Sequence, residues 1–150
     1  MKKLATSSRA QTALLSICTA WLLTLSAAYL WPAAWWLEVR SVWVDDTTAG
    51  APVVMHVDRR IKRDFVGRWS VTVRELQGVE NTLACVASAA GDYKVGARLP
   101  KTLTLGWWTN GRCEGLPAGV YVVTTIWEID NGPLPDKIVT AQSNPFKVTP

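Results

Sequence analysis

The sequence predicts an all-β domain, an antiparallel sandwich of seven strands, preceded by one N-terminal transmembrane helix. The helix is predicted from an apolar stretch in which no charged residue occurs between Ala10 and Leu37. The sandwich is predicted from residues 38–150, where apolar and polar residues alternate in short segments separated by turn residues. Many short strands with turn signals between them are typical of a two-sheet architecture.

Composition limits the class of protein further. The chain has 150 residues, of which 49% are hydrophobic, and its nine tryptophans exclude a disordered or low-complexity protein. Its formal net charge of +4 is concentrated in Lys2, Lys3 and Arg9, because acidic and basic residues nearly balance in the rest of the chain. The charge therefore indicates membrane topology, and we expect no nucleic-acid partner.

The N-terminal segment predicts a single membrane span. We expect residues 1–9 in the cytoplasm, a signal anchor at 10–36, and a domain at 37–150 in the periplasm or outside the cell. This places the protein in a bacterial inner membrane. Tryptophans favour the membrane–water interface, and three of them lie near the end of the span: Trp31, Trp35 and Trp36.

A secretory signal peptide is the alternative reading of this segment. The small residues Ser26-Ala27-Ala28 form an acceptable cleavage site, and cleavage near Ala28 would release a soluble domain. The apolar centre from Ala13 to Leu30 is longer than the usual signal-peptide core, which favours the anchor. In both cases the domain lies outside the cytoplasm.

The strands of the domain are predicted from alternation. They lie at about residues 36–44, 53–57, 69–74, 82–87, 102–107, 120–129 and 137–148. The longest places five side chains on one face: Tyr121, Val123, Thr125, Trp127 and Ile129. Turn residues separate the segments, as at Asn110-Gly111 and Asp130-Asn131-Gly132.

One segment resembles a known family. Leu116-Pro117-Ala118-Gly119-Val120-Tyr121 is similar to the Leu-x-Pro-Gly-x-Tyr segment that opens strand F of immunoglobulin-like and fibronectin type III-like domains. The resemblance implies an immunoglobulin-like sandwich in which Tyr121 is a structural corner residue and Trp69 lies near the core. It does not extend to the antibody-type disulfide, because Trp69 precedes both cysteines of the domain. The layout also resembles small bacterial and prophage-encoded membrane-anchored envelope proteins.

Cysteine usage points to a disulfide bond. Cys18 lies within the predicted span, which leaves Cys85 and Cys113 as the only cysteines of the exported domain. An even number in an oxidising compartment favours a bridge between them, with two buried free thiols as the alternative. We expect no metal site, because two cysteines and the single histidine cannot complete a zinc tetrahedron.

No residue pattern indicates catalysis. Alternation places His56 opposite Met55 and Val57, so we expect an isolated histidine on the solvent face. Hydrolase, P-loop and dinucleotide motifs are absent from the sequence, so we expect neither an enzyme nor a cofactor.

Two features are candidate interfaces. Basic residues are concentrated between two acids, Asp58 and Asp64, and just beyond them: Arg59, Arg60, Lys62, Arg63 and Arg68. They predict either a patch for anionic headgroups, cell-wall polymer or an acidic partner, or a solvated strand edge that prevents aggregation; the acids favour the edge.

The second candidate is the pair Trp107-Trp108. Neighbours on a strand point to opposite faces, so at least one indole is partly exposed. The exposed indole would serve as an interface anchor or a sugar-stacking surface. The alternative is that Trp108 covers the end of the sandwich beside Cys113.

These observations predict a non-catalytic, membrane-tethered binding or structural module of a bacterial or phage-encoded cell envelope, with a protein partner in the envelope. Almost no linker separates Trp36 from the first strand, so we expect the domain close to the membrane. The alternative is an exported soluble domain that binds carbohydrate or cell wall.

Overall fold

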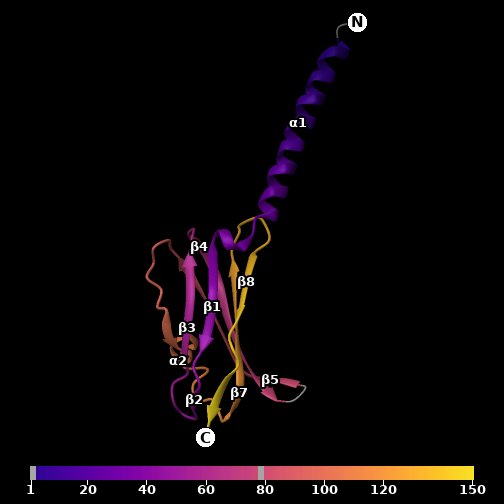
Figure 1. The fold of residues 1–150 in the computed structure, drawn as a ribbon. Helices are drawn as coiled ribbons and strands as arrows, with labels where there is room; N and C mark the ends of the chain where they lie inside the picture. Colours follow the sequence, from indigo (N-terminus) through magenta and orange to yellow (C-terminus); the bar gives the residue numbers. More distant parts are fainter. Residues whose placement is uncertain (1–2, 78–79) are drawn as a thin grey trace.

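The structure is a computed structural model that describes residues 3–77 and 80–150. A long helix, α1 (Lys3–Leu30), extends away from a β-rich domain (Figure 1). Its segment Ala10–Leu30 is long and apolar enough to cross a membrane, with a mean hydropathy of 1.8, and none of it is buried against the domain. The helix ends before the predicted boundary at 36, because Pro32 lacks an amide hydrogen and restricts the residue before it.

Three hydroxyl-bearing residues inside α1 bond back to the helix backbone. Ser16, Thr19 and Thr24 each donate a hydrogen bond to the carbonyl oxygen four residues earlier, at 3.0, 2.8 and 2.7 Å. Hydroxyls bonded in this way are tolerated in an apolar environment. The helix thus keeps its apolar character in spite of these residues.

The described residues form nine strands rather than the predicted seven. They are β1 (Leu37–Val44), β2 (Thr47–Thr48), β3 (Val54–Ile61), β4 (Phe65–Gln77), β5 (Glu80–Tyr93), β6 (Thr102–Thr104), β7 (Gly119–Ile129), β8 (Lys137–Gln142) and β9 (Phe146–Thr149). The short β2 lies in the predicted turn after β1. The last predicted strand is divided into β8 and β9 at residues 143–145, where Pro145 cannot donate to a ladder.

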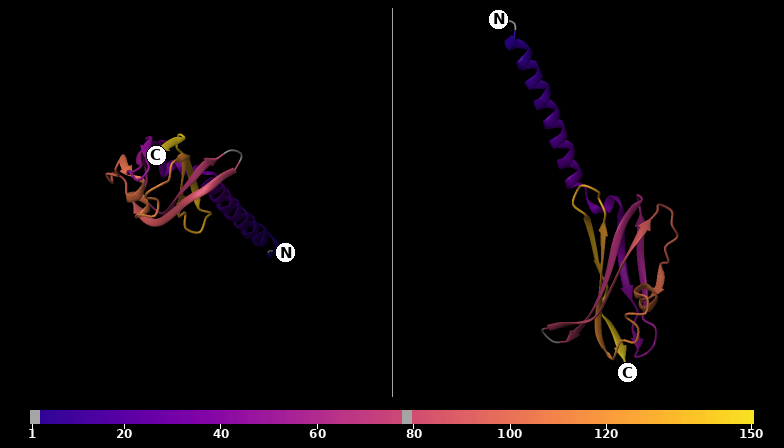
Figure 2. Two further views of the ribbon diagram at one scale, coloured as in Figure 1. Left: turned by 90° about the horizontal axis from the view of Figure 1, so that it is seen from below. Right: turned by 180° about the vertical axis from the view of Figure 1, so that it is seen from behind.

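Two sheets face each other. β1, β3 and β6 form one sheet in the order β1-β3-β6, and the other six strands form the second in the order β2-β9-β7-β4-β5, with β8 also paired to β7. All pairs are antiparallel except the two-residue contact of β2 with β9. In the right-hand view of Figure 2, the β4–β5 hairpin projects sideways from the lower part of the domain, and α1 leaves from its upper end.

The core lies between the sheets. The predicted inward face of β7 is confirmed, since all five of its side chains are at most 1% exposed. The largest side chains with less than 2% exposure are Trp127, Tyr121 and Phe146. Three indoles pack in a row across the core, with Trp108 between Trp69 at 5.6 Å and Trp127 at 6.1 Å.

The predicted alternation from Leu103 to Trp107 is wrong beyond Thr104. The chain turns there into a short helix, α2 (Leu105–Thr109). The Thr104 hydroxyl caps it by accepting a hydrogen bond from the Trp107 amide at 3.1 Å. Asn110, with a φ of 53°, ends the helix in the left-handed conformation.

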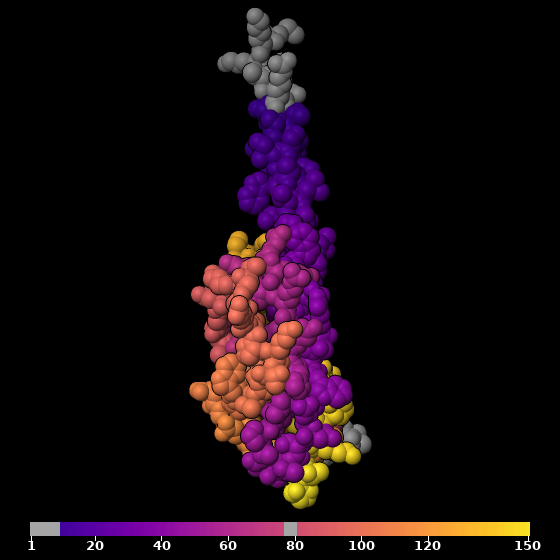
Figure 3. All heavy atoms as spheres, turned by 60° about the vertical axis from the view of Figure 1, so that its left-hand side comes forward, coloured from indigo at the N-terminus to yellow at the C-terminus, as the bar shows by residue number. Residues whose placement is uncertain are grey.

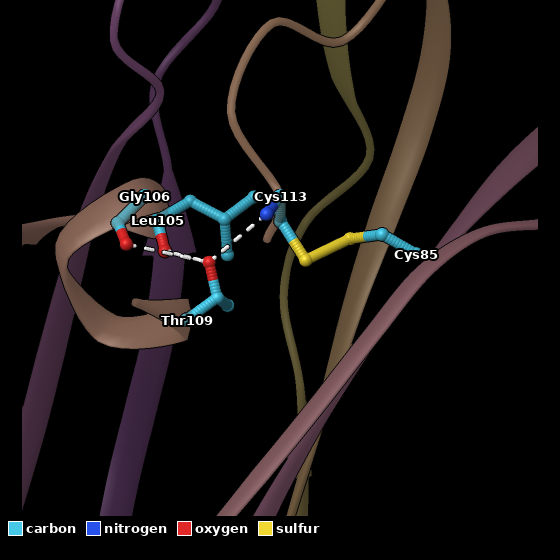
Figure 4. The surroundings of a disulfide bond; sticks show 5 residues. All are labelled: Cys85, Leu105, Gly106, Thr109 and Cys113. Carbon is cyan, nitrogen blue, oxygen red and sulfur yellow. Dashed lines mark hydrogen bonds between the residues drawn. A yellow bond between two sulfur atoms is a disulfide. The ribbon is translucent and has the colours of Figure 1, made fainter. Parts of the chain in front are cut away.

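The disulfide between Cys85 and Cys113 is confirmed (Figure 4). Cys85 belongs to β5, the edge of the six-stranded sheet, and Cys113 follows α2, which extends the edge of the other sheet. The Thr109 hydroxyl donates to the Leu105 carbonyl at 2.8 Å and accepts from the Cys113 amide at 3.1 Å. The bond therefore joins the two sheets at one open side of the domain.

Tyr121 is the third residue of β7, beside the corner where the chain enters that strand. Its hydroxyl donates to the Pro117 carbonyl at 3.0 Å, and its side chain is fully buried. Burial, together with the nearby charge of Glu75, raises the pKa of the Tyr121 hydroxyl. The group therefore stays protonated and remains a hydrogen-bond donor at neutral pH.

Replacing this hydroxyl should weaken the fold. Tyr121→Phe keeps the ring but removes the bond to Pro117, so we expect a loss of about 1 kcal/mol in the free energy of unfolding, measured by denaturant titration. Tyr93→Phe is the matched control, because its ring stack on Phe65 at 4.5 Å remains. An equal loss in both variants would contradict the role of the Tyr121 bond.

The pH dependence gives a second readout. Since the folded-state pKa of Tyr121 is raised, the unfolded chain releases its proton first, and stability falls as pH rises above the unfolded value of about 10. Tyr121→Phe should lose less stability over that range than the parent protein.

Candidate functional site

The β3–β4 turn contacts the short segment that joins α1 to the domain. The amides of Lys62 and Arg63 both donate to the Trp36 carbonyl, at 2.8 and 3.4 Å. The Arg63 guanidinium lies over the Trp35 ring, 4.6 Å from its centroid. Trp35 belongs to η1 (Ala33–Trp35), the single turn that joins α1 to β1. A turn distant in sequence therefore holds the junction.

β8 and the loop before it contact the end of α1. The ammonium of Lys137, the first residue of β8, donates to the Tyr29 carbonyl of α1 and lies 5.4 Å from the Tyr29 ring centroid. Leu134 of the β7–β8 loop lines a recess with Leu25 and Leu30 of the helix. Contacts from this side thus reach the helix itself, whereas the β3–β4 turn contacts the residues that follow it.

The predicted basic cluster does not form one surface. Arg59 and Arg60 are neighbours on β3, so their side chains point to opposite faces of the strand. Arg60 is exposed, whereas Arg59 lies on the inward face of β3 and is half-buried. Arg68 lies on β4, in the other sheet, in a recess that contains three carboxylates: Glu128, Asp130 and Asp136.

Lys62 is engaged by a neighbouring strand. Its ammonium lies 3.0 Å from a carboxylate oxygen of Glu38 on β1, which Arg40 also contacts at 3.3 Å. Hydrogen bonds from these two cations lower the pKa of Glu38. Lys62 is therefore a partner of β1 and is not free for an anion.

A groove of about 470 Å³ lies between the second half of β3 and the loop that follows β5. Basic residues lie on both walls: Arg59 and Arg60 on β3, Arg98 and Lys101 in the loop, with the Arg60 side chain on the opposite face of the strand from Arg59. Apolar residues and a glycine complete the lining: Val57, Ile61, Val95, Gly96, Ala97 and Leu99. No carboxylate is among these lining residues, although the Asp64 carboxylate accepts from the Val95 amide at one wall, so the lining side chains carry a net positive charge.

Arg59 gives the groove its distinct chemistry. Its guanidinium lies 5.1 Å from the centroid of the buried Trp108 ring. The Nε atom is buried and has no hydrogen-bond partner within residues 3–77 and 80–150. Burial lowers the pKa of Arg59, although the nearby Tyr93 opposes that effect. A buried cation with an unused donor is a favourable site for an anion.

His56 is not the isolated residue that alternation predicts. Its Nε2 lies 2.9 Å from the Asp45 carboxylate, and its Nδ1 lies 3.1 Å from the Thr102 hydroxyl. The strand register explains both contacts, because His56 lies opposite Trp43 on β1 and Thr102 on β6. These residues connect three strands on the outer face of the small sheet, beside an indole of Trp43 that is 56% exposed.

The two adjacent tryptophans have opposite environments. Trp107 is 67% exposed, whereas Trp108 is 8% exposed and packs in the core. Successive side chains on a helix are separated by about 100°, which places one indole inside and the other outside. Trp108 therefore covers the interior beside the Cys113 loop, and Trp107 is the indole available to a partner.

The geometry can be compared with known proteins. No protein-family model and no curated protein matches this chain. In the described residues no group of three or more His, Cys, Asp and Glu side chains could hold a metal ion. Function is therefore inferred from the chain's own features.

Sequence reasoning missed three residues of these surfaces: Arg98, Lys101 and Trp43. The first two lie in a segment without strand periodicity. The pairing of β6 with β3 brings that segment onto β3, together with the Val57 amide, which donates to the Lys101 carbonyl at 2.7 Å. Trp43 alternates with buried Val42 and Val44, and that alternation was the available signal for an exposed indole.

Proposed function

We propose that this protein is a non-catalytic, membrane-tethered binding or structural module of a bacterial or phage-encoded cell envelope. The N-terminus lies in the cytoplasm and the domain lies in the periplasm or outside the cell. The observation that carries the proposal is the junction, where an apolar helix continues through one turn into β1 and two loops hold it. Such a domain meets its partner at a fixed place beside the membrane, as a subunit of a membrane complex does.

The strand order supports an immunoglobulin-like identity for the domain. The order β1-β3-β6 corresponds to strands A, B and E of that family, and β9-β7-β4-β5 corresponds to G, F, C and C′. Tyr121 then opens strand F, and Trp69 lies on strand C. Sandwiches of this kind serve as binding and structural modules, and the analogy of fold supports only that general class.

The disulfide supports the exported location of the domain. Disulfide bonds persist in oxidising compartments such as the bacterial periplasm and are rare in the cytosol. The bond between Cys85 and Cys113 lies in the domain, while Cys18 of α1 is free.

Topology can be tested by cysteine labelling. In a Cys18→Ala background, one new cysteine is placed in the exposed loop (Ala97→Cys) or in the N-terminal segment (Thr6→Cys). We expect full-length protein in the membrane fraction after carbonate washing. A membrane-impermeant maleimide should label the Ala97→Cys protein in cells with a permeabilised outer membrane and the Thr6→Cys protein only after lysis. The reverse labelling pattern would contradict the proposed orientation.

A second function has one observation in its favour. The indoles of Trp107 and Trp43 are exposed at 67% and 56%, and flat aromatic rings of this kind stack on sugars. In this case the protein is an exported soluble domain that binds carbohydrate or cell wall after cleavage near Ala28. A soluble mature protein that begins at Tyr29, with glycan binding lost in Trp107→Ala, would favour it over the anchored module.

A further inference from the structure

The groove between β3 and the loop after β5 lies at the end of the domain nearest α1. Ile61, in its wall, pairs with Leu37, the first residue of β1. The other wall is held at the same end, because the Val95 amide donates to the Asp64 carboxylate at 2.7 Å. Figure 3 looks onto this face, where the salmon-coloured residues of the loop lie beside the magenta residues of β3.

We propose that this groove binds the phosphate of an anionic phospholipid headgroup. The inference rests on the proposed membrane-tethered function, which places this end of the domain at the bilayer surface. It goes beyond that function by naming a ligand and the residues that hold it: Arg59, Arg98 and Lys101.

The charges of the groove require an anion. Arg59, Arg98 and Lys101 form no ion pair with a carboxylate of the described ranges 3–77 and 80–150. Arg59 is the decisive member, because its Nε is buried without an acceptor, and a buried donor that lacks a partner is unfavourable. A bound anion would supply that acceptor and the missing countercharge.

The residue types favour phosphate. Guanidinium groups present a planar fork of donors that matches phosphate oxygens, and an ammonium adds a point charge. The groove, at about 470 Å³, has room for more than an inorganic ion, and a phosphoglycerol headgroup falls within the size range of small-molecule sites.

The lining of the groove and its position favour a lipid as the source of that phosphate. Apolar side chains line the groove beside the cations, among them Val95, which is 56% exposed, and Leu99. Mixed apolar and basic lining suits the boundary between headgroups and acyl chains. Trp31 and Trp35, with ring centroids 5.0 Å apart, lie at the junction and mark the same level.

The test compares lipid-dependent stability of the full chain in nanodiscs. One set of discs contains phosphatidylglycerol, and the other contains only zwitterionic phosphatidylcholine. We expect the melting temperature of the domain to be about 5 °C higher with phosphatidylglycerol, because a ligand that binds only the folded state stabilises it. Equal melting temperatures in the two discs would overturn the proposal.

Three variants assign the effect to the groove. Arg98→Gln, in the loop, and Arg59→Met, on β3, should each remove at least half of the lipid-dependent shift. Arg68→Gln is the matched control, because it removes the same charge near the same end of the domain but on the other sheet, and it should keep the full shift. An equal reduction in all three variants would indicate general attraction to an anionic surface and would overturn the assignment.

Arg59→Met also separates binding from folding. In phosphatidylcholine discs we expect it to melt within about 3 °C of the parent temperature, because losing the contact with the Trp108 ring and removing a buried donor that lacks a partner have opposite effects. The variant should therefore be folded yet insensitive to phosphatidylglycerol. If it melts lower in neutral lipid and still gains the full shift, Arg59 is structural and the proposal fails.

A last arm identifies the source of the phosphate. Glycerol 1-phosphate or inorganic phosphate, added at about 10 mM to the detergent-solubilised chain, should shift the melting temperature by less than about 1 °C. A shift as large as that with phosphatidylglycerol would overturn the lipid assignment in favour of a soluble ligand. Retention in the membrane fraction after carbonate washing is measured separately on cells that make the same protein. Loss of retention contradicts the anchored topology, whereas equal melting temperatures contradict the groove.

Discussion

Removing the disulfide should lower the free energy of unfolding of the domain by about 3–4 kcal/mol. Cys85 and Cys113 are separated by 28 positions, and a cross-link that closes a loop of this size restricts the unfolded chain by that amount in the chain-entropy model. In the double variant Cys85→Ser, Cys113→Ser, the restriction is absent. The melting temperature should fall by roughly 15 °C, as measured by tryptophan fluorescence of the full chain in neutral detergent.

The chain supplies a matched control for this variant. Cys18 is free and lies in α1, away from the domain, so Cys18→Ser should leave the unfolding transition unchanged. Reduction of the parent protein with dithiothreitol should reproduce the double variant. A double variant within 1 kcal/mol of the parent would show that the loop after α2 is held without the bond.

Trp108→Ala should destabilise the domain by about 3–5 kcal/mol, whereas Trp107→Ala should change its stability by no more than about 0.5 kcal/mol. Trp108 is 8% exposed between two other indoles, so its removal leaves a cavity. Trp107 is 67% exposed and loses little packing. Denaturant titration of the two variants, which differ by one position, measures the contrast directly.

Trp108→Ala has a second consequence for the groove. The Trp108 ring lies beneath the guanidinium of Arg59, and such contacts are worth more when they are desolvated. We expect the variant to weaken lipid-dependent stabilisation as well as the fold, while Trp107→Ala affects neither. Similar stability in the two variants would contradict the packing of α2 described above.

Patterns in a short stretch of sequence predicted the elements whose structure depends only on that stretch. The apolar helix needs only its own residues, and the inward face of β7 follows from alternation along one strand. β2 is different, because Thr47 and Thr48 become a strand only through parallel pairing with Val148 and Thr149, about a hundred residues away. Likewise, α2 is too short for periodicity to reveal, and its Thr104 cap does not stand out among threonines.

The candidate site depends even more on contacts between residues that are distant in sequence. Sequence proximity grouped Arg59 with Arg60 and Arg68, yet alternation and the β3–β4 turn direct these three side chains to different places. Arg98 and Lys101 lie some 40 residues from Arg59 in the chain but share a groove with it. A site assembled from a strand and a distant loop depends on tertiary contacts that no local pattern contains.

The short junction between α1 and the domain has a geometric consequence. β7 runs the length of the domain in 11 residues, or about 35 Å, from the end that holds β9 to the end beside α1 (Figure 1). The three-residue turn η1 leaves almost no chain between the helix and β1. In the proposed membrane-tethered arrangement, a partner that docks on the far end is therefore held at a distance set by the length of the strands rather than by a flexible tether.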